Sequence, residues 1–157
     1  MALLGLALAA QDGLKLELKA YKVLLVEEDG KTVEKLVEAL EVAPGDVLEW
    51  VLTAKNEGKV PLRQVALTIP IPKNTVYIPG TAKPLVLGEL KIEPLFSYDG
   101  KRFARPPLKK KIKVKVGDRV EEKEVVVPPE EYTHVRWVVP ELAPGQVVKV
   151  SLRTRVR

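Results

Sequence analysis

The chain has 157 residues, which suits one ordinary domain and is short for two. Apolar residues make up 46% of it, enough to bury a core, and the formal net charge of +5 is spread along the sequence rather than gathered as in a dedicated nucleic-acid binder. The sequence holds no cysteine, which excludes disulfides, thiolate nucleophiles and cysteine-bound metals.

The first ten residues, M-A-L-L-G-L-A-L-A-A, are apolar and end in small side chains. Ala7-Leu8-Ala9 supplies the A-x-A pattern of a cleavage site, so residues 1–10 are predicted to be a secretory signal peptide, truncated in that it lacks a basic start. The alternative is an apolar tail or a short first strand. The run is too short to span a bilayer, which takes about 20 apolar residues, and no other stretch approaches that length. Residues 11–157 are expected to form a single domain.

Alternation of apolar and polar residues, the pattern of a half-buried strand, dominates the chain. Strands are predicted over 14–19, 21–27, 32–41, 47–55, 65–69, 112–116, 122–127, 135–139 and 148–156, with short strands and loops over 73–107. Segment 32–41 also fits a helical face, but the strands around it favour a strand. Seven to nine short antiparallel strands with regular turn signals and no convincing helix predict an all-β domain, a β-sandwich.

Turn formation explains the positions of the aspartates and one short repeated sequence. Each of the five aspartates stands beside a glycine, which is typical of tight turns, and they are not spaced as ligands of a hard cation. The sequence Ala43-Pro44-Gly45-Asp46-Val47 returns as Ala143-Pro144-Gly145-Gln146-Val147. Either a duplicated domain or two equivalent strand starts on opposite sheets would produce this repeated sequence.

Residues 43–82, A-P-G-D-V-L-E-W-V-L-T-A-K-N-E-G-K-V-P-L-R-Q-V-A-L-T-I-P-I-P-K-N-T-V-Y-I-P-G-T-A, resemble a repeat of bacterial and archaeal surface and exported proteins known as domain of unknown function eleven. The matching features are Pro44-Gly45-Asp46, Asn56 with Gly58, Pro70, Pro72, Tyr77 and Gly80-Thr81-Ala82. Residues 96–103, 132–137 and 142–145 are also similar to parts of this family, so the resemblance covers roughly 40–157. It implies an immunoglobulin-like β-sandwich, an exported location and no catalytic residues. The family often occurs in tandem arrays, whereas this chain has room for one copy.

The sequence predicts no catalytic, metal or cofactor site. His134 is the only histidine, and alternation places it on the side of its strand opposite to Trp137. It could serve as a general base only beside Ser97 or Ser151, and neither serine lies in a nucleophile motif such as G-x-S-x-G. An exposed strand histidine is therefore expected. One histidine without cysteines cannot build a zinc site. Trp50 and Trp137 are predicted to pack in the core.

One basic cluster is the candidate site for an anionic ligand or a partner. It consists of Arg102, Arg105, Lys109, Lys110, Lys111, Lys113 and Lys115. Such a cluster could bind an anionic polymer, lipid headgroups or nucleic acid. The preferred interpretation is a solvated strand face whose lysines guard a sheet edge, neutralised in large part across the Gly117-Asp118 turn by Glu121, Glu122 and Glu124.

These observations predict a non-catalytic, exported structural or binding module of the cell envelope, in the periplasm or at the cell surface. It would dock an envelope protein or a surface polymer through loops or a sheet edge, and nucleic acid is not the expected partner. The alternatives are a periplasmic chaperone or assembly factor that lends a strand, for which Val125-Val126-Val127 is the one apolar edge, a cytosolic polyanion-binding domain, and an enzyme of unrecognised type. The scarcity of Asn and Gln is typical of a thermophile protein.

Overall fold

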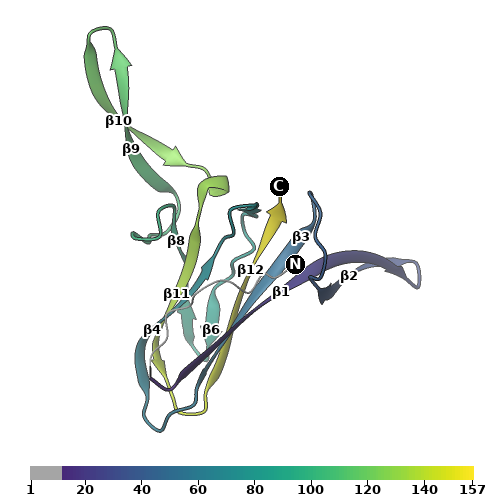
Figure 1. Cartoon of the computed structure of the whole chain (residues 1–157). Coiled ribbons are helices and arrows are strands. Elements are labelled where there is room, and N and C mark those ends of the chain that lie inside the picture. Colours follow the sequence, from purple (N-terminus) through teal and green to yellow (C-terminus); the bar gives the residue numbers. More distant parts are fainter. Residues whose placement is uncertain (1–11) are drawn as a thin grey trace.

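The computed structural model describes residues 12–157 and is built almost wholly of β-strands (Figure 1). The elements are β1 Leu14–Glu28, β2 Lys31–Glu38, β3 Val47–Asn56, β4 Leu62–Pro70, β5 Thr75–Tyr77, β6 Leu85–Leu87, β7 Leu90–Ile92, β8 Leu95–Ser97, β9 Leu108–Val116, β10 Arg119–Val127, the 3-10 helix η1 Pro129–Glu131, β11 His134–Leu142 and β12 Val147–Val156. The all-β prediction is confirmed, and so is a strand within 32–41. The predicted leader lies outside the described residues. The described residues hold twelve strands rather than the seven to nine expected, because the short strands predicted within 73–107 are four, β5 to β8, while the predicted strands 14–19 and 21–27 are one, β1.

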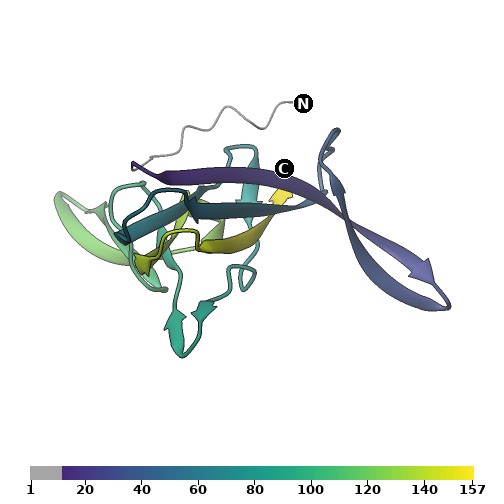
Figure 2. The ribbon, with the colours of Figure 1, turned by 90° about the horizontal axis from the view of Figure 1, so that it is seen from below.

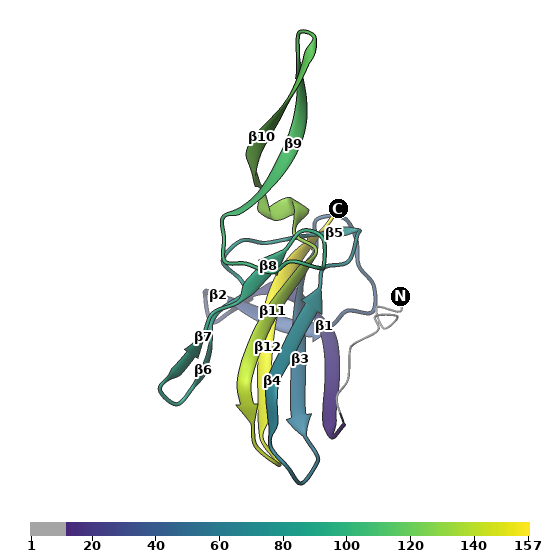
Figure 3. The same ribbon diagram turned by 90° about the vertical axis from the view of Figure 1, so that its left-hand side faces the viewer.

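Two antiparallel sheets form the body of the molecule. Sheet A has the order β2-β1-β3-β12-β5, and sheet B has the order β4-β11-β8. Figure 1 shows the two layers, with β4 and β11 on the left and β12, β3 and β1 to their right, and Figure 3 shows them turned by a quarter. The pairs β6–β7 and β9–β10 are separate two-stranded hairpins.

The core lies between the inner faces of the two sheets, where the predicted alternation sets the side chains. Leu48, Trp50 and Leu52 of β3 are at most 1% exposed, and Trp137 of β11 is fully buried. Each indole N–H is satisfied: Trp50 Nε1 donates to Thr154 Oγ1 at 2.9 Å, and Trp137 Nε1 donates to the carbonyl of Lys83 at 2.9 Å. The prediction that both tryptophans are core residues is confirmed.

The repeated Ala-Pro-Gly turns begin neighbouring strands of one sheet, not equivalent strands of opposite sheets. β3 and β12 pair antiparallel, so the two turns lie at opposite ends of the pair. Gly45 N donates to the carbonyl of Val156 at 2.8 Å, and Gly145 N donates to that of Asn56 at 2.7 Å. In both turns the side chain two residues after the proline accepts from the first alanine N–H at 2.8 Å. The repeated sequence therefore reflects a local two-fold relation, in which one turn lies at each end of the antiparallel β3–β12 pair.

Two long hairpins leave the sandwich (Figures 1 and 2). Over 14–22 β1 pairs with β3, but over 21–28 it pairs with β2 and carries the hairpin beyond the body of the sheet. We call residues 21–38 arm 1. The hairpin of β9 and β10, residues 108–127, is arm 2, and no other strand among the described residues pairs with it.

Candidate docking hairpins

Ser97, Asp99 and His134 meet in space but are not arranged for nucleophilic catalysis. Ser97 pairs directly with His134 across β8 and β11. However, Ser97 is fully buried, and its hydroxyl donates to Asp99 Oδ1 at 3.0 Å rather than to the imidazole. The Nδ1 atom of His134 lies 2.8 Å from Thr133 Oγ1 instead. A buried serine whose proton points at a carboxylate is a turn element, because a nucleophile must reach both its base and its substrate.

The loop after β8 explains why His134 is less exposed than predicted. Gly100 and Phe103 of this loop lie against the imidazole, with the ring centroids of Phe103 and His134 6.3 Å apart in an edge contact. This burial lowers the pKa of His134 from its usual value. The backbone N–H groups of Arg102 and Lys101, each donating to the Asp99 carboxylate, lower the pKa of Asp99 to about 2.

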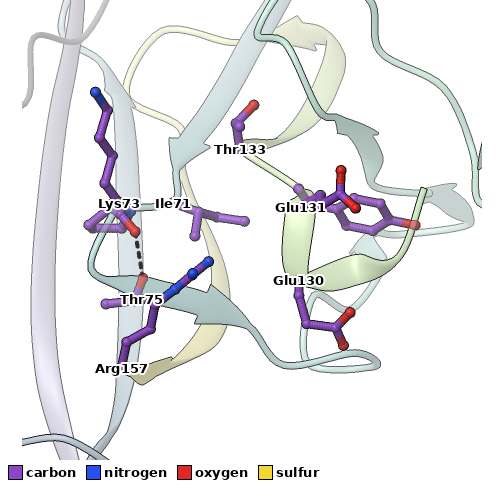
Figure 4. A pocket seen from close by; sticks show the side chains of 9 residues that line it. Ile71, Lys73, Thr75, Glu130, Glu131, Thr133 and Arg157 are labelled. Atoms are coloured by element: carbon purple, nitrogen blue, oxygen red, sulfur yellow. Dashed lines mark hydrogen bonds between the residues drawn. The ribbon is translucent and has the colours of Figure 1, made fainter. Parts of the chain in front are cut away.

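A pocket of about 330 Å³ opens beside η1 (Figure 4). It is lined by Ile71, Pro72, Lys73, Thr75, Glu130, Glu131, Tyr132, Thr133 and Arg157. Burial raises the pKa of Tyr132, whose ring packs against Tyr77 and Phe96 with centroids 6.0 and 5.2 Å away. The Thr75 hydroxyl donates to the Pro72 carbonyl at 3.0 Å. Over residues 12–157, no three acidic or histidine side chains gather where they could hold a metal.

Four lysines of the predicted cluster share one face of arm 2. Residues paired across an antiparallel hairpin share a face, so these lysines lie with the β10 residues opposite them. We call this set the basic face: Lys109, Lys111, Lys113 and Lys115 of β9 with Val120, Glu122, Glu124 and Val126 of β10. Arg102 and Arg105 precede the hairpin in the loop after β8, and Lys110 projects from its other face.

The expected neutralisation by glutamates is only partial. Glu122 stands opposite Lys113, and Glu124 stands opposite Lys111, with a further ion pair of 3.7 Å to Lys109. Glu121 lies on the other face of the hairpin, so two glutamates, not three, offset the four lysines. Lys110 forms its own ion pair with Glu131 at 2.8 Å. The basic face therefore keeps an excess of positive charge.

Arm 1 carries a charged face that was not predicted from the sequence. Pairing places Leu25 and Leu36 on one face together with Glu27, Glu34 and Glu38. We call this the acidic face, since it holds no basic residue. Two features of the sequence could have indicated this face: the Glu27-Glu28-Asp29 run at the hairpin tip, and apolar residues on both sides of the strand.

The acidic face is tied to the sandwich at one point. Both carboxylate oxygens of Glu34 accept from Arg153 of β12, at 2.9 and 3.0 Å, and Arg153 Nε also donates to Glu49 at 3.0 Å. The guanidinium lowers the pKa of Glu34, and the two carboxylates raise that of Arg153. Bidentate contacts of this kind fix geometry as well as charge.

Exposed apolar side chains concentrate on the projecting hairpins. Of the thirteen large hydrophobic residues that are exposed between residues 12 and 157, ten lie on arm 1, arm 2 and the β6–β7 hairpin. They are Leu24, Leu25, Leu36, Val37, Val86, Leu90, Ile112, Val116, Val120 and Val126. In the apolar edge predicted at Val125-Val126-Val127, only Val126 is exposed, at 60%, whereas Val127 is buried at the base of the hairpin.

The comparisons with known proteins add no further indication of function. No protein-family model matches the chain, and no curated protein or solved structure matches it significantly. The resemblance of residues 43–82 to the surface-protein repeat stays a prediction. In the described part of the chain there is no helix with the length and apolar character needed to cross a membrane.

Proposed function

We propose that this chain is a non-catalytic structural or binding module that docks a protein partner through its projecting hairpins. The observation that carries the proposal is that, in the described part of the chain, ten of the thirteen exposed large hydrophobic residues lie on those hairpins. Scattered apolar side chains on a surface are ordinary, but a concentration on projecting elements marks an interaction surface. An isolated two-stranded hairpin is marginally stable in water, so a partner that buries its apolar side chains would stabilise it.

The chemistry of the body supports a binding role rather than catalysis. In the cluster of Ser97, Asp99 and His134, the serine is fully buried and its hydroxyl bonds to Asp99. The pocket beside η1 mixes Lys73 and Arg157 with Glu130 and Glu131, so its lining carries charges of both signs.

The proposal includes export to the cell envelope and an immunoglobulin-like relationship of the sandwich. The signal-peptide pattern of residues 1–10 and the resemblance of residues 43–82 to exported surface repeats support it. Cell fractionation with intact-mass analysis tests the location. A mature chain that begins near Ala10 or Gln11 in the periplasmic or surface fraction is expected. An intact chain in the cytosol would contradict export and favour the polyanion-binding alternative.

Site-specific photo-cross-linking in the native cell tests docking by the hairpins. A photoreactive residue is placed at Leu25, Val86 or Val126, and the matched controls are Val60 and Val147, which are exposed apolar residues outside the hairpins. We expect discrete cross-linked protein bands from at least one hairpin position and none from the controls. Equal cross-linking at Val60 and Val147, or none at any hairpin position, would contradict the proposal.

A further inference from the structure

The two arms carry net charges of opposite sign. Between residues 108 and 127, seven basic side chains stand against four acidic ones, which gives a net charge of +3. Between residues 21 and 38, three lysines stand against five acidic side chains, which gives −2. More than half of the chain's formal charge of +5 thus lies on arm 2, so the excess is not spread evenly as the sequence suggested.

The difference in charge is clearer when one face of each arm is compared. The acidic face of arm 1 has three glutamates and no basic residue, and its exposed apolar side chains are Leu25, at 70%, and Leu36, at 44%. The basic face of arm 2 has four lysines against two glutamates, and its exposed apolar side chains are Val120, at 66%, and Val126, at 60%. Each face therefore combines an excess of one sign with apolar area that a partner could bury.

Two charged side chains on each of these faces are not engaged in ion pairs within residues 12–157. Glu27 and Glu38 on the acidic face form no ion pair with any described residue, and the same is true of Lys113 and Lys115 on the basic face. Opposed surfaces of this kind steer association and fix which surfaces meet.

The arms of one chain cannot meet each other. In Figure 1 arm 2 extends upward from the sandwich and arm 1 extends to the right, and Figure 3 likewise shows arm 2 projecting from one end of the body. A partner for either arm must come from another molecule. Contact between two acidic faces of arm 1, or between two copies of arm 2, would bring like charges together, which is unfavourable. On the other face of arm 1, Lys22 and Lys35 already form ion pairs with Asp46 and Glu28.

We propose that the acidic face of arm 1 in one copy of the chain docks on the basic face of arm 2 in another copy. This inference rests on the proposed function of the hairpins as docking surfaces and names a second copy as the partner. The contact is heterologous, because two different surfaces meet, so copies associate head to tail. Such an assembly grows as a filament unless its rotation closes it into a ring.

Sedimentation velocity on the full chain tests the inference, with samples from micromolar concentration upward. In 0.1 M salt, where the screening length is about 10 Å, we expect species larger than one chain that grow with concentration. In 1 M salt, where the length is about 3 Å, the same samples should shift toward single chains. A single chain at every concentration in 0.1 M salt would overturn the inference.

Charge reversal identifies the surfaces. Glu27→Lys with Glu38→Lys makes arm 1 basic, and Lys113→Glu with Lys115→Glu makes arm 2 acidic. Each pair alone should weaken association by about tenfold or more, because like charges then face each other. The four changes combined in one chain should restore association, since the arms again carry opposite charges. Association that survives either pair unchanged, or that the combination fails to restore, would overturn the inference.

A matched control separates these effects from a general change of charge. Glu130→Lys with Glu141→Lys alters the net charge as much as the arm 1 pair does, but both residues are exposed and lie outside the arms and the β6–β7 hairpin. This variant should associate as the unmodified chain does, and circular dichroism should show every variant folded. If the purified chain stays single while hairpin positions cross-link to a different protein in the cell, the second copy is wrong as the partner and docking by the hairpins stands.

Discussion

Asn56, the last residue of β3, is fully buried, and its amide joins three segments of the sandwich. The Nδ2 atom donates to the carbonyls of Val60 at 2.8 Å and Leu142 at 2.9 Å, while Oδ1 accepts from the Gly58 N–H at 2.9 Å. The side chain therefore fixes the loop after β3 against the end of β11. Alanine at this position would remove all three bonds and leave the buried Leu142 carbonyl without this partner.

The magnitude follows from the bonds that are lost. A hydrogen bond contributes about 0.5–1.5 kcal/mol net, so three together contribute about 3 kcal/mol to the free energy of unfolding. For a chain of this length, each kcal/mol lowers the melting temperature by about 2–4 °C. We expect Asn56→Ala to unfold about 6–12 °C below the unmodified protein.

Asn56→Asp gives an independent check with a pH signature. The carboxylate would face the Val60 and Leu142 carbonyls with an acceptor in place of a donor, in a site shielded from water. Burial of the charge raises the pKa of the new carboxyl in the folded state above its unfolded value. The folded state then binds more protons, so the stability of this variant should recover as pH falls and decline as pH rises through the folded-state pKa.

Urea unfolding followed by tryptophan fluorescence measures these changes, because Trp50 and Trp137 are both buried and lie in different sheets. Asn74→Ala is the matched control: Asn74 is exposed, so the change should stay within about 0.5 kcal/mol. A loss below about 1 kcal/mol for Asn56→Ala would refute the reasoning, because it would mean that the three bonds add little to the fold.

Three further predictions concern turns and the anchor of arm 1. Gly100→Ala should destabilise the protein more than Gly117→Ala in thermal unfolding. Both glycines have positive φ, 78° and 61°, which costs about 1–2 kcal/mol for alanine. Only at Gly100 would the new Cβ also lie 2.9 Å from another side chain, the His134 ring. Equal losses would contradict this. Glu34→Ala should speed amide hydrogen exchange over 31–38 and leave 108–127 unchanged. The global loss should be about 1 kcal/mol or less, since the one pair it breaks, with Arg153, is half exposed on the glutamate side. Unchanged exchange over 31–38 would mean that the guanidinium does not hold arm 1. Asp99→Asn should be less stable than the unmodified protein above pH 3.8, and the difference should close as pH falls through about 2, because the pKa of Asp99 is depressed to that value. A difference that persists at the lowest pH would show that the amide, not the lost charge, causes it.

The strands of the body were predictable because each shows both a buried and a solvated side. In β3 the alternation of Leu48, Trp50 and Leu52 with polar neighbours coincides with burial by the opposite sheet. The same holds for Trp137 in β11. Period two fixes which side chains share a face, and a core between two sheets then buries one face of each strand.

The arms were not predictable, because alternation does not say whether a second layer covers the apolar side. Ile112 and Val116 of β9 alternate with lysines as regularly as core residues do, yet they are 37% and 48% exposed. Likewise nothing in residues 14–28 marks the point where β1 changes partner from β3 to β2. Burial is a tertiary property, and it depended here on where the sheets end.

The contact between Ser97 and His134 was only partly predictable. Ser97 lies in β8, a strand of three residues whose pairing with His134 is set by the loops around it. Sequence reasoning identified Ser97 as one of two serines that could meet the histidine, and it does pair with it. The direction of its hydroxyl, toward Asp99, depends on a turn that only the structure shows.

In the proposed assembly, the charges on the arms both prevent indiscriminate strand pairing and allow pairing with one oppositely charged face. A projecting hairpin with exposed apolar residues and open strand edges can pair with any similar strand, and charged side chains on edge strands, lysine above all, prevent this. On arm 2 the lysines repel other basic hairpins, so indiscriminate pairing is disfavoured. The same lysines attract an acidic face such as that of Glu27 and Glu38 on arm 1. Exposed apolar area is then safe to keep, because the charge beside it limits which surface can cover it. If the lysines only kept arm 2 soluble, Lys113→Glu with Lys115→Glu would leave an equally soluble single chain and association would not depend on the sign of arm 1.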